Sequence, residues 1–255
     1  MYDVTVVTVY ITPEMYRAFF TSNPYFNDYE LVGIDNRQLN RGLPTIYNEI
    51  IQNYQDRDCW LFFLHEDLQV KSSLAGIGEL DRGFVYGTFG IQLEGNVPMA
   101  YGRHTCSDKD GSNAVEVGLA INTPAAVQTL DCQTLLVHTS LLAKYPQLRF
   151  DEKLSFDLYA EDFCINARER YGIESRVFPL DFQHYSHGNI TQRYHDGLRY
   201  LADKYPNVAL PGSCSFIGGR AADLEKHFTY NIRANRGSAW VMRVLRRLGI
   251  YAQRL

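Results

Sequence analysis

The sequence lacks several features that assign a protein to a class at once. No stretch approaches the roughly 18 consecutive apolar residues of a membrane-spanning helix. Basic residues are not in excess, because 25 Lys and Arg stand against 29 Asp and Glu, giving a net charge of −4. The 5 cysteines contain no CxxC pair and are odd in number, which fits neither a disulfide framework nor a zinc ribbon. We therefore expect a protein of a reducing compartment with no nucleic-acid partner.

The sequence also shows no targeting segment and no linker. The first ten residues, MYDVTVVTVY, lack the basic and then apolar regions of a signal peptide, so we expect a cytoplasmic protein. No internal repeat or Pro-, Gly- or Ser-rich linker divides the chain, and its 45% hydrophobic content suits a packed core. We expect one catalytic domain over residues 1–230, followed by a different kind of segment over 231–255.

Strand-like and helix-like segments alternate through the first two thirds of the chain. Strands are predicted over 3–10, 30–35, 58–64 and 175–182, and helices over 42–55 and 159–172, with a helix-compatible segment from Pro13 and a loop over 107–113. The strands are apolar on both faces, as in a sheet covered by helices on both sides. The expected fold class is α/β, with a mostly parallel central sheet and helices on both faces.

Polar residues follow three of these strands. The run LFFLHED is apolar until it ends in an imidazole and two carboxylates. In open α/β sheets, ligands bind outside the carboxyl ends of the strands, so these ends are candidate sites for a nucleotide and a hard cation. The candidates are Thr8, Tyr10, Asp35, Asn36, His65, Glu66 and Asp67. Each of them alone also fits a helix cap or a turn, and that alternative stays open.

Three motifs in order resemble glycosyltransferase family 2. IDNRQLNRGLPTIYNEI resembles the family's strand-end Asp-Asn followed by Asn-x-Gly, and LFFLHED resembles the strand that ends in its DxD motif. RFDEKLSFDLYAEDFCINARERYG is similar to its acceptor-side block, in which a Glu-Asp pair opens an amphipathic helix. The resemblance spans about residues 3 to 190.

The resemblance implies a GT-A fold, a nucleotide-sugar donor, a glycan or lipid-linked acceptor and a divalent metal, Mn²⁺ or Mg²⁺. It implies that Asp35 contacts the donor's base or ribose, that Asp67 binds the metal, and that Asp162 is the catalytic base. The chain departs from the DxD pattern at His65, because imidazole ligates Mn²⁺ but suits Mg²⁺ poorly. His65 is therefore a metal ligand or a ribose contact, with Glu66 as a compensating acid.

Four further residues are candidates because of where they lie in the sequence relative to these motifs. His184 and His187 follow the predicted helix, and either is a candidate third metal ligand, with a narrow preference for His187. Arg41 is a candidate for the donor phosphates. Glu161, next to Asp162, is the second candidate base, although acidic residues in a helix's first turn also oppose the macrodipole.

Two other functions compete with sugar transfer. A nucleotidyltransferase that makes nucleotide sugars also places carboxylates at strand ends, but the segment after the first strand, VYITPEMYRAFF, lacks the glycines of a phosphate loop. A carbohydrate- or nucleotide-binding module without catalysis would not need Asp67 and Asp162 together.

The tail over 231–255 is basic and amphipathic. It carries six arginines and no acidic residue, and its apolar residues from Trp240 to Leu248 share one helical face. Such a helix suits contact with a membrane surface, and equally docking on its own domain or on a sister subunit in a homo-oligomer. Both interpretations stay open.

Overall fold

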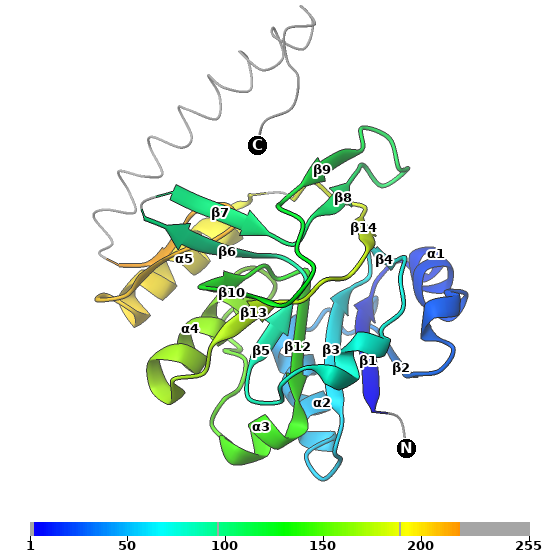
Figure 1. Ribbon diagram of the computed structural model, residues 1–255, viewed down its shortest axis with the longest axis horizontal. Helices are drawn as coiled ribbons and strands as arrows, with labels where there is room; N and C mark the ends of the chain where they lie inside the picture. The colour runs from blue at the N-terminus through cyan, green and yellow to red at the C-terminus, as the bar shows by residue number, and fades with distance from the viewer. Residues whose placement is uncertain (1–2, 96, 189, 220–255) are drawn as a thin grey trace, which may run out of the picture.

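Figure 1 shows the computed structural model, which describes residues 3–95, 97–188 and 190–219. A large twisted sheet fills the centre, helices lie against it, and smaller sheets extend from one side. The tail over 231–255 lies outside the described residues, so the predicted helix there and the domain boundary at 230 stay predictions. Within the described ranges, no helix combines the length and apolarity needed to cross a bilayer.

The central sheet has seven strands in the order β10-β13-β5-β12-β3-β1-β2. Their bounds are β1 (Val4–Tyr10), β2 (Glu30–Asp35), β3 (Trp60–His65), β5 (Val85–Gly87), β10 (Ala125–Val127), β12 (Thr134–His138) and β13 (Ser175–Val177). β1 pairs in parallel with β2 and with β3, and β13 pairs in parallel with β5, whereas β12 runs antiparallel to β3 and β5 and β10 antiparallel to β13. The α/β class is confirmed, but the sheet is mixed rather than mostly parallel.

The two faces of the sheet carry separate apolar clusters, because successive residues of a strand point to opposite faces. Along β3, Leu61 and Phe63 pack into one cluster, whereas Trp60, Phe62 and Leu64 pack into the other. All five are at most 2% exposed. This double burial explains why the strand is a continuous apolar run.

Longer helices cover the first face and short ones the second. On the first face lie α2 (Leu43–Asn53), α3 (Thr139–Lys144), α4 (Tyr159–Tyr171) and α5 (Gln192–Lys204). The second face is covered by α1 (Pro13–Tyr16), the π-helical η1 (Arg17–Thr21) and the 3₁₀ turns η2 (Pro24–Phe26) and η3 (Ala75–Glu79). Helix α4 ends at Gly172, with φ of 66°, as its sequence predicts.

Three smaller sheets complete the described chain. They are built from β4 (Leu68–Val70), β14 (Phe182–His184), β8 (His104–Cys106) and β9 (Val115–Val117); from β11 (Thr129–Leu130), β6 (Gly90–Glu94) and β7 (Val97–Tyr101); and from β15 (Ala209–Pro211) with β16 (Phe216–Gly218). The first of these sheets starts directly after β3, so it continues from the edge where β1, β2 and β3 end. That edge holds the candidate site.

Candidate functional site

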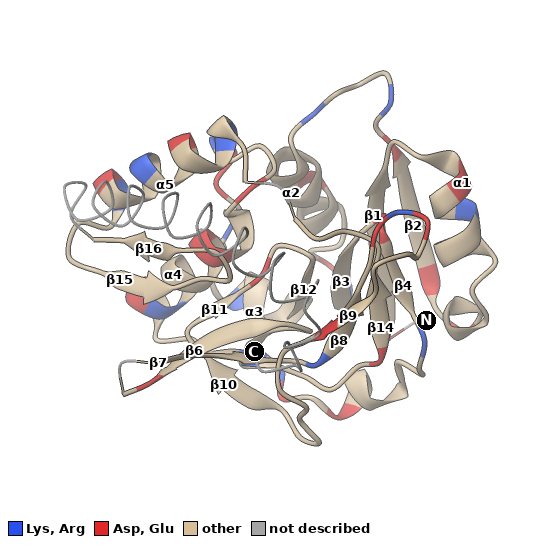
Figure 2. Cartoon of the chain, turned by 90° about the horizontal axis from the view of Figure 1, so that it is seen from above, with Lys and Arg blue, Asp and Glu red and all other residues tan. Residues whose placement is uncertain are grey.

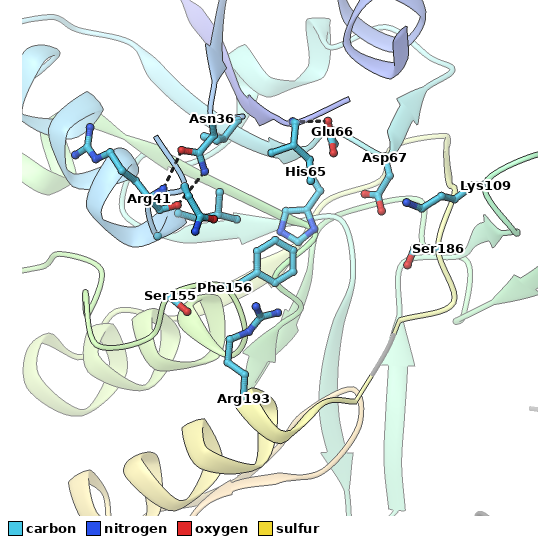
Figure 3. A pocket seen from close by; sticks show the side chains of 15 residues that line it. Asn36, Arg41, His65, Glu66, Asp67, Lys109, Ser155, Phe156, Ser186 and Arg193 are labelled. Atoms are coloured by element: carbon cyan, nitrogen blue, oxygen red, sulfur yellow. Dashed lines mark hydrogen bonds between the residues drawn. The ribbon is translucent and has the colours of Figure 1, made fainter. Parts of the chain in front are cut away.

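A cavity of about 660 Å³ opens at the carboxyl ends of β1, β2 and β3 (Figure 3). Because the three strands are parallel, Ile11, Asn36 and His65 come from successive strand ends and line the same cavity. The rest of the wall comes from the β2–α2 loop, the β8–β9 loop, the segment before α4, and the start of α5. The sheet edge that the sequence predicts as the ligand site therefore contains a cavity.

His65 lies in the middle of this cavity, and one of its ring nitrogens is hydrogen-bonded. Its Nε2 lies 2.9 Å from the Tyr159 hydroxyl, and that hydroxyl donates its own proton to the Cys132 carbonyl at 2.6 Å. The hydroxyl must therefore accept from His65, so Nε2 carries the proton and Nδ1 keeps a free lone pair. Burial lowers the pKa of His65, which favours this neutral form.

Asp67 and His184 face each other across the start of the small sheet. Oδ1 of Asp67 lies 3.4 Å from Nε2 of His184, close enough for attraction between charges. Both atoms are buried and neither has a hydrogen-bond partner among the described residues. Burial opposes ionisation of Asp67, but His184 and His65 outweigh it and lower its pKa to about 2. Burial likewise opposes a charge on His184, yet Asp67 raises the pKa of His184 to about 10.

His65, Asp67 and His184 form what we call the cavity triad, and they suit a divalent cation. Their ligand atoms lie within 4.8 Å of one another. Two imidazoles and one carboxylate favour Mn²⁺ or another transition metal over Mg²⁺, which prefers oxygen ligands. The two unpartnered buried atoms fit such an ion, because buried polar atoms are otherwise hydrogen-bonded.

Basic side chains flank the cavity triad. Figure 3 shows Lys109 pointing toward Asp67 from one side, and Arg193 reaching up from α5 beside Phe156. The guanidinium of Arg193 lies 4.8 Å from the centre of the Phe156 ring, which in turn stacks on His65. Arg41 lines the same cavity and is ion-paired with Glu49, and Arg193 is ion-paired with Asp157 at 2.6 Å. Lys109 and Arg193 therefore supply positive charge on opposite sides of the candidate metal position.

Glu66 and Asn36 hold the cavity wall in place. The Glu66 carboxylate accepts hydrogen bonds from the backbone N–H groups of Ile11 and Thr12, at 2.9 and 2.8 Å. The Asn36 side chain closes the β2–α2 loop, donating to the Arg41 carbonyl and accepting from the Arg41 N–H. Both residues line the cavity, but their polar atoms are occupied by the chain itself.

Three other predicted donor contacts do not line the cavity. Asp35 is ion-paired with Arg37 at 2.6 Å on the surface. Thr8 is fully buried in β1, and Tyr10 stacks on Tyr16 with ring centres 4.2 Å apart. Position at a strand end is therefore insufficient, because alternate side chains leave the strand on opposite faces.

The structure also departs from the preference for His187. Among the described residues, His184 and not His187 joins His65 and Asp67. His187 lies instead beside the β8–β9 loop, with its Nε2 3.3 Å from Asp108. His184 is brought in by the pairing of β14 with β4, a contact between distant segments.

Asp162, the predicted base, points away from the cavity. Its Oδ1 accepts from Lys204 at 2.7 Å and from the Tyr205 hydroxyl at 2.8 Å, and Lys204 also contacts Asp151 at 2.6 Å. We call Asp151, Asp162 and Lys204 the anchor network, because they tie the end of α5 to α4. Lys204 is eleven residues beyond Arg193, about 16 Å along the helix, so Asp162 lies far from the cavity wall.

Glu161 lies in the first turn of α4, next to Asp162. Its carboxylate accepts from the Cys132 thiol at 3.0 Å, and it is 3% exposed. Burial, and to a lesser extent the nearby charges of Asp131 and of Asp157, the ion partner of Arg193, raise its pKa to about 8. The pKa of Tyr194, the residue after Arg193, is raised mainly by burial and also by Glu161. Glu161 itself is not among the residues that line the cavity.

Sequence reasoning missed several residues of the site. Lys109, Phe156 and Arg193 resemble ordinary surface residues in the sequence, and they reach the cavity from a loop, a helix entry and a helix. The entry to α4 is unusual, because Leu158 has a φ of 65° and is buried. This backbone reversal places Leu158 in the core and Phe156 at the cavity.

The resemblance of this chain to known proteins is distant and lies in structure. No protein-family model matches the chain, and no curated protein matches it in sequence. The crystal structure of A197 from STIV is similar over 72% of this chain and 85% of that chain, with 14% identity and a TM-score of 0.41. A glycosyltransferase involved in the glycosylation of the major capsid of PBCV-1 is similar over 76% and 98%, with 9% identity and a TM-score of 0.33. At these values, neither structure defines the activity of this chain.

Proposed function

We propose that this protein is a glycosyltransferase of GT-A fold that moves a sugar from a nucleotide-diphosphate donor to a glycan or lipid-linked acceptor, with inversion and with Mn²⁺ as the preferred cation. One observation carries the proposal: His65 and Asp67, which with His184 form a triad suited to a cation, line one cavity together with two basic side chains at the carboxyl ends of parallel strands. A metal cation and basic side chains together can neutralise the charge of a diphosphate. Open α/β sheets bind nucleotides at this edge.

Different residues at the cavity would bind different parts of the donor. His65, Asp67 and His184 would hold the cation, which supplies positive charge to the departing phosphate oxygens. Lys109 and Arg193 would bind the phosphates from either side. Phe156, 43% exposed, supports Arg193 through its ring. Glu66 and Asn36 keep the loops around the donor in one conformation.

We infer that Glu161, rather than Asp162, is the proton-accepting group, and because Glu161 is buried behind the cavity lining, the acceptor must open a path to it. Inverting transfer needs one carboxylate to take the proton of the acceptor hydroxyl as its oxygen attacks the anomeric carbon. Asp162 is held by a lysine at the far end of α5, whereas the nearest donor to Glu161 is a thiol. A pKa of about 8 also suits a base that works near neutral pH.

The competing functions make different demands on the cavity. A nucleotidyltransferase needs a phosphate loop after its first strand, but the loop after β1 is fastened to Glu66 and contains no glycine. A binding module without catalysis would bind nucleotide sugars and never release the nucleoside diphosphate. Release over time therefore separates an enzyme from a module.

The decisive variant is Asp67→Asn, studied in the full chain. We measure Mn²⁺ binding by electron paramagnetic resonance, and the thermal shift caused by UDP-, GDP-, dTDP- and CMP-sugars with and without Mn²⁺. Wild type should show a shift with one donor class that depends on Mn²⁺, because a ligand bound only to the native state raises its melting temperature. Asp67→Asn should lower Mn²⁺ affinity at least tenfold and abolish the donor shift.

Asp58→Asn is the matched control, because Asp58 precedes the same strand, β3, at its opposite end and is 65% exposed in its side chain. It should bind Mn²⁺ and donor as wild type does. Unchanged donor binding by Asp67→Asn would contradict the proposal, and so would a wild-type protein that binds no nucleotide sugar.

A further inference from the structure

A second group of metal-ligating side chains lies beside the cavity triad. His104, Cys106 and His184 place one nitrogen or sulfur atom each within 4.8 Å of one another. His104 and Cys106 are two residues apart on β8, so they share one face of the strand. His184 is the direct cross-strand partner of Cys106 in the pairing of β8 with β14. The small sheet therefore brings three ligands from two strands, β8 and β14, close together.

The orientation of His104 is fixed by its surroundings. Its Nδ1 donates to the Gly102 carbonyl at 2.9 Å, so Nε2 keeps the lone pair and faces the Cys106 sulfur at 3.3 Å. The ring stacks on Phe182, with centres 4.4 Å apart, and is 5% exposed. A metal-binding imidazole characteristically donates its second N–H to a carbonyl or carboxylate in this way.

Gly102 makes this orientation possible. It has a φ of 97°, and a Cβ atom there would lie 1.9 Å from the Thr88 carbonyl oxygen. Only glycine tolerates both conditions, so the carbonyl that holds His104 is set by the backbone itself.

The ligand set and its spacing match a zinc-class ion. With Zn–S near 2.3 Å and Zn–N near 2.0 Å, tetrahedral sulfur and nitrogen ligands stand roughly 3.5 Å apart, comparable with the 3.3 Å between Cys106 and His104. A thiolate selects Zn²⁺ or Co²⁺ over Mn²⁺ and Mg²⁺. The buried Nε2 of His184 has no hydrogen-bond partner among the described residues.

We propose that His104, Cys106 and His184 form a second metal site, specific for Zn²⁺ and similar thiophilic ions, with a fourth position open to water. It clamps β8 to β14, and β8 leads directly into the loop that carries Lys109. The inference does not rest on sugar transfer, because it concerns ligands that the proposed donor site does not use, apart from the shared His184.

Cobalt titration of the full chain tests the site. Co²⁺ bound to a thiolate gives a charge-transfer absorption in the near ultraviolet, and this band should appear at one equivalent in wild type. Zn²⁺ should displace it. Cys106→Ser should abolish the band, and His104→Gln should weaken Co²⁺ binding at least tenfold. Cys214→Ser, which removes an exposed thiol outside the group, should keep the full band.

The variants separate this site from the cavity triad. Cys106→Ser should still bind Mn²⁺, which also shows that the variant is folded, whereas Asp67→Asn should keep the cobalt band while losing Mn²⁺. His184→Gln should lose both. No thiolate band in wild type, or a band that survives in Cys106→Ser, would overturn the inference, whatever the outcome for nucleotide sugars.

Discussion

The cavity triad and the anchor network are both partly buried groups of ionisable side chains, but their geometry differs. In the anchor network, Lys204 contacts Asp162 at 2.7 Å and Asp151 at 2.6 Å, and the Tyr205 hydroxyl adds a further bond to Asp162. In the cavity triad, the facing atoms of Asp67 and His184 are 3.4 Å apart and unaligned for a hydrogen bond. The carboxylates of the anchor network thus contact a cation, although Oδ2 of Asp162 has no hydrogen-bond partner among the described residues, whereas in the cavity triad neither of the two facing atoms has one.

This difference indicates what each group does. A buried carboxylate is tolerated when a cation and hydrogen bonds offset its desolvation, and then its role is to fix neighbouring elements. In the cavity triad, the facing atoms of Asp67 and His184 both lack a hydrogen-bond partner among the described residues, and this arrangement fits a bound cation. Figure 2 marks acidic and basic positions along α5: Lys204 near its carboxyl end contacts Asp162, while Arg193 near its amino end lines the cavity.

Removal of the lysine from the anchor network should give the largest effect. Lys204→Met leaves Asp162 buried without its cation and should lower the free energy of unfolding by about 3 kcal/mol. Urea denaturation measures this change. Arg199→Gln on the same helix, an exposed partner of Asp196, should change stability by less than about 0.5 kcal/mol. Mn²⁺ affinity should be unchanged in both variants, and a loss of Mn²⁺ binding in Lys204→Met would erase the distinction between the two groups.

Glu161 should show the next largest effect, on transfer rather than stability alone. Its raised pKa of about 8 predicts that the rate of transfer rises with pH up to about 8. Glu161→Gln cannot accept a proton, so transfer should fall about 100-fold or more and lose this pH dependence, with donor affinity near that of wild type. Asp162→Asn should instead mainly lower stability. If Asp162→Asn loses transfer and Glu161→Gln does not, the two roles must be exchanged.

The same carboxyl makes a prediction for stability against pH. Its pKa is 4.5 in a model peptide and about 8 in the folded chain, so the folded state binds its proton more tightly. The stabilising contribution is therefore full below about pH 4.5 and is lost as pH rises through about 8. Glu161→Gln should remove this decline, which melting temperatures between pH 5 and 9 would reveal.

The sequence predicts the parts of this molecule that are locally encoded. β1, β2, β3, α2 and α4 form where apolar periodicity and strand-end residues place them, and the acids after LFFL do reach a cavity. Over 92–130 the sequence predicts only the loop at 107–113, whereas the structure has β7, β8, β9, β10 and β11 there, after the last residues of β6. These short strands depend on partners such as β6, β13 and β14, which are distant in sequence.

The same reason limits prediction of the site. His184 is selected over His187 by the register of β14 with β4, and Asp162 is turned away by a lysine 42 residues later. The group of His104, Cys106 and His184 carries no CxxC signal in the sequence; its two β8 residues share a face because alternate residues of a strand do, and His184 joins them only through strand pairing.

The smallest expected effect is on donor affinity, and it concerns Arg193, a basic residue that lines the cavity. Arg193 is ion-paired with Asp157 at 2.6 Å and lies over Phe156, yet its side chain is 53% exposed, so it contributes little to the core. Arg193→Gln should weaken donor binding about tenfold, because one charge-assisted contact to phosphate is lost while the cation site stays intact. Calorimetric titration with the donor identified by thermal shift measures this, and Arg199→Gln, two turns further along α5, is again the control. Equal donor affinity in the two variants would show that positive charge on α5 does not act on the cavity, and would leave phosphate binding to the cation site and Lys109.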